Sequence, residues 1–309
     1  MKSSVLRELE ELTTEARNPK STNIDRESTL GILRIINEED KLVPLAIEKE
    51  LPKIAKAVDS IVESFRAGGR LIYIGAGTSG RLGVLDASEC PPTFGSPPEM
   101  VQAIIAGGDS ALRQPIEGAE DSVQAGASAI MRCSVSPKDV VVGICASGRT
   151  PFVIGALKKA NELGAKTVAL TTNPGSKITK YAKISIAPDV GPEVIAGSTR
   201  MKSGTAQKLV LNMLTTASMI LLGKVYGNLM IDLKPLSEKL RERAKGMIML
   251  LTGASYEEAS RVYKESGEDV KLSILILKGR LSLDSAKALL QKANGRVSIA
   301  LDYAMHTRK

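Results

Sequence analysis

The chain has 309 residues, of which 43% are hydrophobic and 25% charged, and its formal net charge is +8. These values fit a soluble globular protein with room for one large domain and a small one. The excess positive charge lies in residues 201–309, while residues 1–200 hold equal numbers of basic and acidic side chains. Aromatic residues make up only 3%, and basic residues alternate with acidic ones, so we expect solvated helix faces and no nucleic-acid partner.

The cysteines and the single histidine limit the chemistry open to the chain. Three cysteines without Cys-x-x-Cys spacing, and no signal peptide, predict a reducing, cytoplasmic location. No uncharged apolar run reaches the roughly 18 residues of a spanning helix, so no membrane partner is expected. His306 lies at the end of the chain, which argues against a Ser-His-Asp triad and a His-rich metal site. We therefore expect no metal and no cofactor, and carboxylates, lysines or hydroxyls must carry any chemistry.

The first part of the chain is predicted to be helical. Residues 5–15 have helical apolar spacing, Ser28 is expected to cap a helix that ends at Asn37, and a longer helix is predicted from about Val43 to Arg66. We assign residues 1–55 to an N-terminal helical segment that packs on the sheet or on a partner chain.

The rest of the chain is organised around an apolar run, Leu71 to Ile74, that ends in glycines. Thr78 and Ser79 follow, and a helical pattern begins at Arg81. A strand, a tight turn and a helix N-terminus form the geometry that binds anions through free backbone N–H groups and the helix dipole. We predict a phosphate-binding turn here that includes Gly77.

Glu89 closes this segment, because the helix is predicted to stop before Cys90-Pro91-Pro92. Apolar neighbours and the like charge of Asp86 are the surroundings that raise a carboxyl pKa, which suits a general acid. The alternative is a solvated acid at a helix end. Cys90 is expected to be a buried small side chain rather than a nucleophile, because no imidazole can activate it.

Continuous apolar strands alternate with helices after this point, which predicts a parallel sheet covered by helices on both faces. The predicted strands are Val101–Ala106, Asp139–Ile144, Thr167–Leu170 and Ile184–Ile186.

Two strand ends carry the same tripeptide, Ser79-Gly80-Arg81 and Ser147-Gly148-Arg149, and Thr150 follows the second one. Pro151 is well placed as the first residue of the next helix. Since ligands of open parallel sheets bind at the carboxyl ends of strands, two hydroxyl-bearing loops there would surround a phosphate or a sugar.

A third loop supplies further polar groups at a helix start. Ser198, Arg200 and Lys202 precede the long apolar helix predicted at residues 206–222. The two cations are suited either to bind phosphate or to complement an acidic surface on a partner chain.

The glycines Gly75, Gly77 and Gly80 also match the dinucleotide-binding pattern. That pattern requires an acidic residue about 20 positions on, and the nearest one, Asp109, lies too far along the chain. Thr78 and Ser79 favour an isolated phosphate ester over a nicotinamide cofactor.

The remaining candidate is Glu120, which sits among Glu117 and Asp121, so surface exposure is the default interpretation. Residues 56–230 are assigned to the phosphosugar-binding domain and residues 235–309 to a small all-helical domain. Its helices are predicted at residues 236–251, 255–264, 268–278 and 282–293, with Ser255 and Ser282 as N-caps.

Long motifs throughout the chain resemble those of N-acetylmuramic acid 6-phosphate etherases, lyases of the SIS (sugar isomerase) fold related to the glucokinase regulatory protein. The resemblance covers about residues 10–295, whereas the tail beyond Gly295 departs from the family pattern and Ser203 stands where alanine is common. The motifs are Thr14–Asn18, Ile24-Asp25, Gly75–Gly95, Gly191–Val194, Gly197–Thr205, Leu209–Leu222 and Tyr226–Met230.

The resemblance implies an α/β fold with a five-stranded parallel sheet between helices, a homodimer, and a C-terminal helical domain. It implies cleavage of the D-lactyl ether of N-acetylmuramic acid 6-phosphate, in cell-wall recycling, to N-acetylglucosamine 6-phosphate and D-lactate. The family's catalytic glutamates fall on Glu89, as proton donor to lactate, and on Glu120. Two other functions stay open: a non-catalytic phosphosugar sensor and a sugar-phosphate isomerase.

Overall fold

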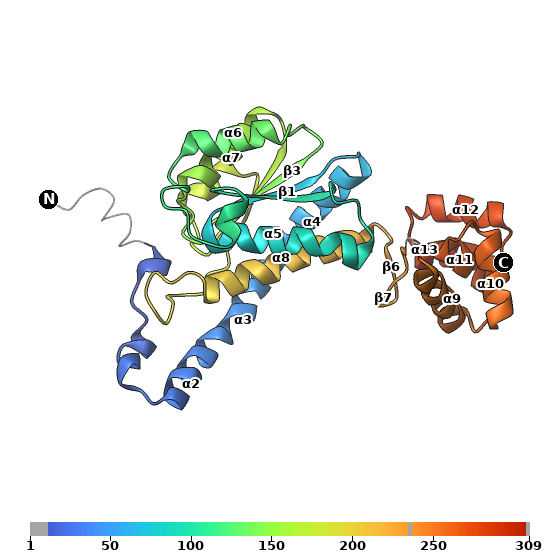
Figure 1. The fold of residues 1–309 in the computed structure, drawn as a ribbon, viewed down its shortest axis with the longest axis horizontal. Coiled ribbons are helices and arrows are strands. Elements are labelled where there is room, and N and C mark those ends of the chain that lie inside the picture. The colour runs from blue at the N-terminus through green and yellow to red at the C-terminus, as the bar shows by residue number, and fades with distance from the viewer. Residues whose placement is uncertain (1–11, 234–236, 307–309) are drawn as a thin grey trace. The chain divides into compact units, whose positions relative to one another are not determined.

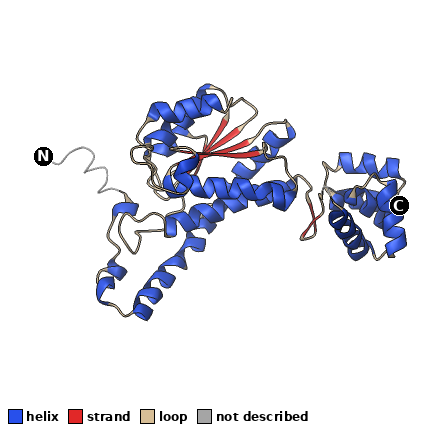
Figure 2. Ribbon diagram, viewed as in Figure 1, coloured by secondary structure: helices blue, strands red, loops and turns tan. Residues whose placement is uncertain are grey.

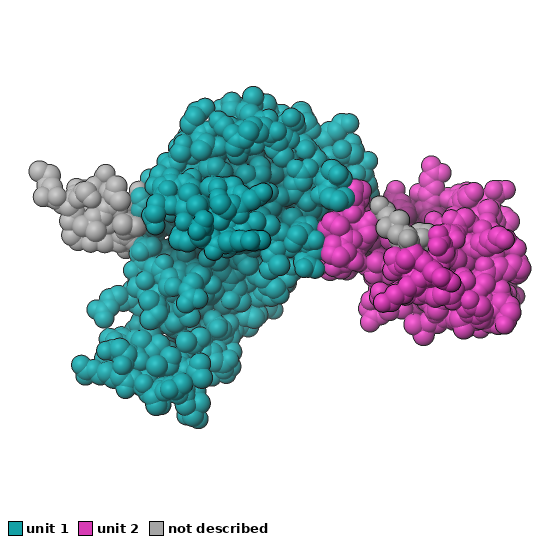
Figure 3. All heavy atoms as spheres, in the orientation of Figure 1, with its two compact units in different colours: residues 1–89, 98–215 teal, residues 90–97, 216–309 magenta. Residues whose placement is uncertain are grey.

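The computed structural model describes residues 12–233 and 237–306. The chain forms two compact units, one of residues 1–89 and 98–215 and the other of residues 90–97 and 216–309 (Figure 3). The expected helix at residues 5–15 lies mostly outside the described residues, which begin with a 3-10 turn at Thr13–Glu15. The division into domains at residues 55, 230 and 235 stays a prediction.

The first unit is built on a five-stranded parallel sheet in the order β2-β1-β3-β4-β5 (Figures 1 and 2). The apolar runs expected to be strands form it, which confirms the predicted fold class. β1 and β3 are buried along their whole length, as β-branched and apolar strands of a covered parallel sheet should be. The strands are β1 (Leu71–Gly75), β2 (Val101–Ile105), β3 (Val140–Ile144), β4 (Lys166–Leu170) and β5 (Ile184–Ile186).

Helices cover both faces of this sheet. Figure 1 shows α6 (Val123–Arg132) and α7 (Pro151–Glu162) on one face, and α4 (Leu51–Arg66), α5 (Gly77–Phe94) and α8 (Lys202–Leu221) on the other. Buried Ile72, Ile74 and Val141 pack with residues of α6 and α7 in one apolar cluster. Pro151 begins α7, as predicted.

The N-terminal helices differ from the prediction in two respects: the helix after Ser28 ends at Asp40 and not at Asn37, and the long helix that follows is divided. Ser28 caps α2 (Thr29–Asp40) as expected, because its side chain accepts the N–H of Gly31. The long helix predicted from Val43 to Arg66 is two helices, α3 (Leu42–Glu48) and α4. Pro52 has no N–H to donate to the preceding turn, which accounts for the break between the two helices. The Glu50 carboxylate lies at this break and accepts the N–H of Ala187 at 2.9 Å.

The predicted ends of α5 are wrong at both termini. The helix begins at Gly77, whose φ of +52° suits glycine, and not at Arg81. It does not stop at Glu89 but continues through Pro91 and Pro92 to Phe94. The two missing N–H donors do not end it: the N–H of Gly95 donates to the Pro91 carbonyl at 2.9 Å, and Lys224 Nζ donates to the Phe94 carbonyl at 3.0 Å.

α8 begins four residues before its predicted start because a distant side chain caps it. The buried Glu193 carboxylate accepts the N–H groups of Lys202 and Ser203 at 3.0 and 2.9 Å. A carboxylate at this position satisfies free N–H groups and complements the positive end of the helix dipole.

Within residues 222–233 and 237–306, which belong to the second unit, the structure forms a short hairpin and five helices. The predicted N-caps Ser255 and Ser282 are confirmed. The last helix was not predicted, although Val297, Ala300, Leu301 and Ala304 bury one of its faces. The elements are β6 (Val225–Tyr226), β7 (Leu229–Met230), α9 (Glu238–Thr252), α10 (Tyr256–Glu265), α11 (Val270–Gly279), α12 (Leu283–Lys292) and α13 (Val297–His306). Within residues 12–233 and 237–306, no helix has the length and apolarity to traverse a bilayer.

Candidate functional site

The register of the sheet brings the two hydroxyl-bearing loops together. β1 pairs with β3 so that Gly75 lies opposite Ile144, and the chain leaves both strands at the same edge. The loop after β1 enters α5 at Gly77, and the loop after β3 enters α7 at Pro151. Two helix N-termini therefore lie at the same edge of the sheet, one on each face, and a helix N-terminus favours an anion.

A hollow of about 280 Å³ lies at the start of α5, and we call it the α5 hollow. It brings Glu120 beside Gly77 and Arg81, so a predicted catalytic carboxylate and the predicted phosphate-binding turn share one cavity. The N–H of Phe152 donates to the Glu120 carbonyl at 3.0 Å, which ties the acidic turn to the start of α7. The hollow is lined by Ala76, Gly77, Arg81, Ala106, Ala111, Pro115, Ile116, Glu117, Gly118, Ala119, Glu120 and Asp121.

Glu120 is exposed, as the default interpretation expected, and yet its electrostatic surroundings are unusual. Partial burial raises the pKa of its carboxyl, and the negative charge of Asp121 raises it further. Both effects disfavour the ionised form, so this carboxylate holds a proton more tightly than an isolated glutamate does.

The loop after β3 opens on a second, more cationic cavity of about 280 Å³, the β3 hollow. Ser147 and Arg149 line it, while Gly148 has a φ of +68° that favours glycine. Thr150 accepts a hydrogen bond from the Cys145 thiol at 3.0 Å. The sequence did not single out the other lining residues, which are Leu12, Thr13, Asn173, Pro174, Gly175, Ser176, Lys177 and Lys180.

The hydroxyls predicted at the first turn of α5 face α8. Ser79 is buried, and its Oγ donates to Gln207 Oε1 at 2.9 Å. Thr78 packs beside Gly204, the third residue of α8. Ser79 thus joins α5 to α8 through its side chain, while its backbone lies in the turn that was predicted to bind phosphate.

Lys202 was predicted to bind substrate, and the structure places it in a buried ion pair. Its Nζ lies 2.6 Å from Glu39 Oε2, and both side chains are almost fully buried. Burial opposes ionisation of Glu39, but hydrogen bonds from Lys202, Lys20 and Asn18 outweigh it and hold the pKa of Glu39 below its usual value. Lys202 therefore anchors α8 to α2.

The other two polar residues of that loop are more accessible. Arg200 is exposed and Ser198 is half-buried. Neither lines the α5 hollow or the β3 hollow.

Within one chain, the structure does not bring Glu89 to Glu120. Glu89 is exposed and follows Gly77 by twelve residues, which is ~18 Å along the axis of α5. It does not line the α5 hollow.

Asp86, one turn before Glu89, is the residue that fixes this part of α5. Its carboxylate accepts hydrogen bonds from Tyr73, Asn212 and Thr215 at 2.9, 2.7 and 3.2 Å. Burial raises the pKa of Asp86 despite these bonds. The acidic neighbour noted in the sequence is thus an anchor between β1, α5 and α8, which local spacing did not indicate.

The described residues contain no group of three or more His, Cys, Asp and Glu side chains placed to hold a metal ion.

Comparison with known proteins identifies the family. Residues 53–161 match the glucokinase regulatory protein N-terminal SIS domain, and residues 122–217 match the SIS domain. N-acetylmuramic acid 6-phosphate etherase from Caldanaerobacter subterraneus subsp. tengcongensis is 56% identical over 293 residues, covering 95% of this chain and 96% of that relative. The etherase from Glaesserella parasuis serovar 5 is 58% identical over 294 residues, covering 95% of this chain and 97% of that relative.

Among solved structures, a phosphoheptose isomerase from Neisseria gonorrhoeae is 19% identical with a TM-score of 0.47, covering 62% of this chain and 99% of that one. The resemblance seen in the sequence is confirmed by the curated relatives, because the match extends over nearly the full length of both chains. The chain belongs to the N-acetylmuramic acid 6-phosphate etherase family.

Proposed function

We propose that this protein cleaves the D-lactyl ether of N-acetylmuramic acid 6-phosphate with water, giving N-acetylglucosamine 6-phosphate and D-lactate. The observation that carries the proposal is the identity of 56–58% to etherases over 95% of the chain. The presence of Glu120 and the α5 N-terminus in one hollow supports it independently.

The proposed reaction is an elimination followed by hydration. The ether oxygen at C3 of the open-chain sugar lies β to the aldehyde, so removal of the C2 proton gives an enolate that expels lactate. Water then adds across the double bond. These steps require a base, an acid and an anchored phosphate. We assign Glu120 as the base at C2, because its raised pKa makes its carboxylate a stronger proton acceptor than an ordinary glutamate.

The phosphate is proposed to bind where α5 and α7 begin. The two helix N-termini and the hydroxyls at this edge suit a phosphate ester. Lys202 forms a buried ion pair with Glu39. We therefore propose that it holds the start of α8 in place and does not contact the substrate. The proposed binding residues are Gly77, Thr78, Ser79, Ser147, Gly148, Arg149 and Thr150.

A homodimer is proposed to complete the site. Glu89 is the proposed acid for lactate departure, but α5 holds it ~18 Å from the turn at Gly77 in the same chain. Glu89 of the partner subunit would reach the α5 hollow if the two copies packed with their α5 helices antiparallel. The exposed Arg200 and the half-buried Ser198 are proposed to meet the phosphosugar across the same interface.

We further infer a cytoplasmic enzyme that recycles cell-wall amino sugars. None of the three cysteines, Cys90, Cys133 and Cys145, is in a disulfide, as expected of a reducing compartment.

The decisive test of function is release of D-lactate from N-acetylmuramic acid 6-phosphate by the purified protein. We expect stoichiometric D-lactate and N-acetylglucosamine 6-phosphate. A phosphosugar sensor, which the match to the glucokinase regulatory protein domain would favour, predicts binding without turnover. An isomerase predicts interconversion of hexose 6-phosphates with no lactate.

The two glutamates are expected to fail at different steps. Glu89→Gln should retain exchange of the C2 proton with deuterated solvent while losing lactate release by at least about 100-fold, because only departure of lactate needs the acid. Glu120→Gln should lose both. Glu117→Gln, in the same acidic turn, is the matched control and should retain both activities. If Glu89→Gln abolished exchange as well, Glu89 would be the base and the assignment would be reversed.

Mixing inactive variants tests the shared site. Random exchange of subunits between Glu89→Gln and Glu120→Gln should restore about a quarter of the wild-type sites, because each mixed dimer contains one site with both native carboxylates. Activity is measured after co-refolding, against each variant refolded alone. No recovery from verified mixed dimers would place both glutamates of each site in one chain.

The pH profile tests the surroundings of Glu120. Asp121→Asn removes a negative charge that raises the pKa of Glu120, so the pKa should fall. Since a base works in its ionised form, the acidic limb of kcat/KM against pH should move to lower pH. Asp109→Asn, an exposed acid outside the α5 hollow, should leave the limb unchanged. A limb that moved to higher pH, or that stayed in place in both variants, would contradict the assignment of Glu120 as base.

A further inference from the structure

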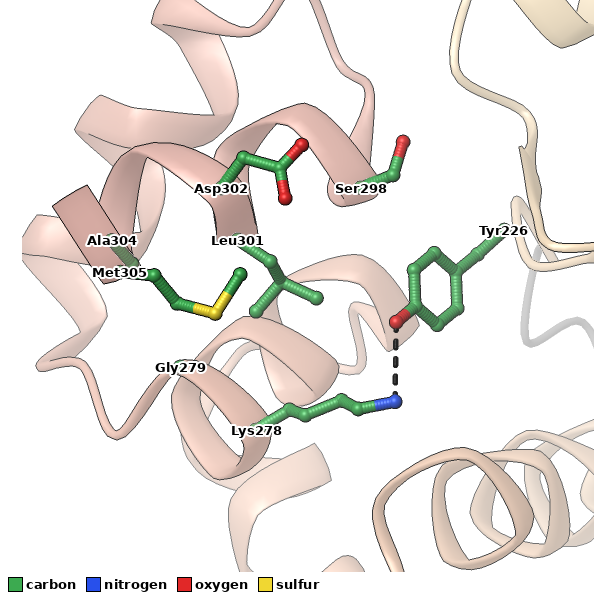
Figure 4. A pocket seen from close by; sticks show the side chains of 8 residues that line it. All are labelled: Tyr226, Lys278, Gly279, Ser298, Leu301, Asp302, Ala304 and Met305. Atoms are coloured by element: carbon green, nitrogen blue, oxygen red, sulfur yellow. Dashed lines mark hydrogen bonds between the residues drawn. The ribbon is translucent and has the colours of Figure 1, made fainter.

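The helical unit contains a small cavity of its own, which we call the α13 hollow. It measures about 230 Å³ and lies between β6, the end of α11 and α13 (Figure 4). All its lining residues belong to residues 216–309, so it shares no residue with the α5 hollow or the β3 hollow. The lining consists of Tyr226, Lys278, Gly279, Ser298, Leu301, Asp302, Ala304 and Met305.

One face of α13 forms the greater part of this hollow. Ser298, Leu301, Asp302 and Met305 are three or four residues apart, which places them in a row along the helix. Leu301 is 8% exposed and forms an apolar floor, and Met305, 60% exposed, extends that floor to the rim. The hollow therefore offers an apolar base with polar groups around it.

The polar groups carry one charge of each sign. Lys278 Nζ donates to the Tyr226 hydroxyl at 3.2 Å and lies 5.3 Å from the centre of its ring, so Tyr226 holds the ammonium group at the mouth. An ammonium group has three donors, and this contact uses one. Figure 4 shows Asp302 and Lys278 on opposite sides of Leu301.

We propose that the α13 hollow binds a small aliphatic zwitterion of the α-amino-acid class. The carboxylate of the ligand is bound by Lys278 and the Tyr226 hydroxyl, its ammonium group by Asp302, and its side chain covers Leu301 and Met305. Charge-assisted hydrogen bonds of this kind are the stronger ones in proteins. The volume of about 230 Å³ is large enough for a molecule of this size.

A simple anion or cation fits the same walls less well. A phosphate ion would be attracted by Lys278 but repelled by Asp302, and it would leave the apolar floor in contact with water. An amine without a carboxylate would be attracted by Asp302 but repelled by Lys278. Only a ligand with both charges and an apolar body satisfies all three parts of the wall. This goes beyond the proposed etherase activity and does not depend on it.

Methyl NMR on the full-length protein tests the proposal, because Met305 supplies a probe at the rim. The protein is labelled with ¹³C at the methionine methyl groups, and the Met305 signal among the ten methionines is identified by its loss in Met305→Leu. We expect L-leucine to shift the Met305 signal in a saturable way at millimolar concentration, while the methionines outside the hollow keep their positions. N-acetyl-L-leucine, which lacks the ammonium group, and leucinamide, which lacks the carboxylate, should each bind at least about tenfold more weakly.

Two variants identify the charges. Lys278→Met and Asp302→Asn should each weaken L-leucine binding by about tenfold or more. Lys292→Met is the matched control, because Lys292 also stacks on a tyrosine of this unit, Tyr303 at 4.9 Å, but lies outside the hollow; its affinity should be unchanged. Unshifted signals of the other methionines verify that each variant is folded. The proposal is overturned if the Met305 signal does not respond, if both leucine derivatives bind as well as leucine, or if Lys292→Met weakens binding as much as Lys278→Met.

Discussion

The pairing of β1 with β3 is the constraint on which the rest of the site depends. Both strands are fully buried, so a shift in register would move apolar side chains out of their places against helices on both faces. The register that results puts Gly75 opposite Ile144, and α5 and α7 consequently begin at the same edge of the sheet, on opposite faces. The proposed phosphate site uses both helices, because the sheet brings their positive ends to a single edge.

Several polar residues near this edge serve the scaffold. Glu193 caps α8, Lys202 pairs with Glu39, and Ser79 bonds to Gln207. A buried ion pair is costly to assemble, but removing one partner leaves an uncompensated charge, so such a pair fixes the positions of the two elements it joins. Some of the hydroxyls and cations that could attract a phosphate, such as Ser79 and Lys202, thus hold α5 and α8 in place. The others are proposed to bind the phosphate.

The sequence allowed the strands to be predicted because each is a continuous apolar run, and the start of α7 because Pro151 marks it. It did not reveal the partner of Lys202, since Glu39 lies 163 residues away and no local pattern encodes that contact. The same limit applies to Asp86, whose partners come from β1 and α8. Pro91 and Pro92 misled the prediction of α5, because the helix continues through both to Phe94, whose carbonyl accepts a hydrogen bond from the distant Lys224.

The position of Glu89 is set by the contacts that hold α5 in place. Three hydrogen bonds to Asp86 fix how α5 is rotated against β1 and α8, and Glu89 follows one turn later with its direction already set. Glu89 lies ~18 Å along the axis of α5 from the turn at Gly77, and it does not line the hollow that holds Glu120. If both carboxylates act on one substrate, we propose that Glu89 comes from another copy of the chain. Catalysis would then require the dimer, and a monomer would bind the phosphosugar without completing the reaction.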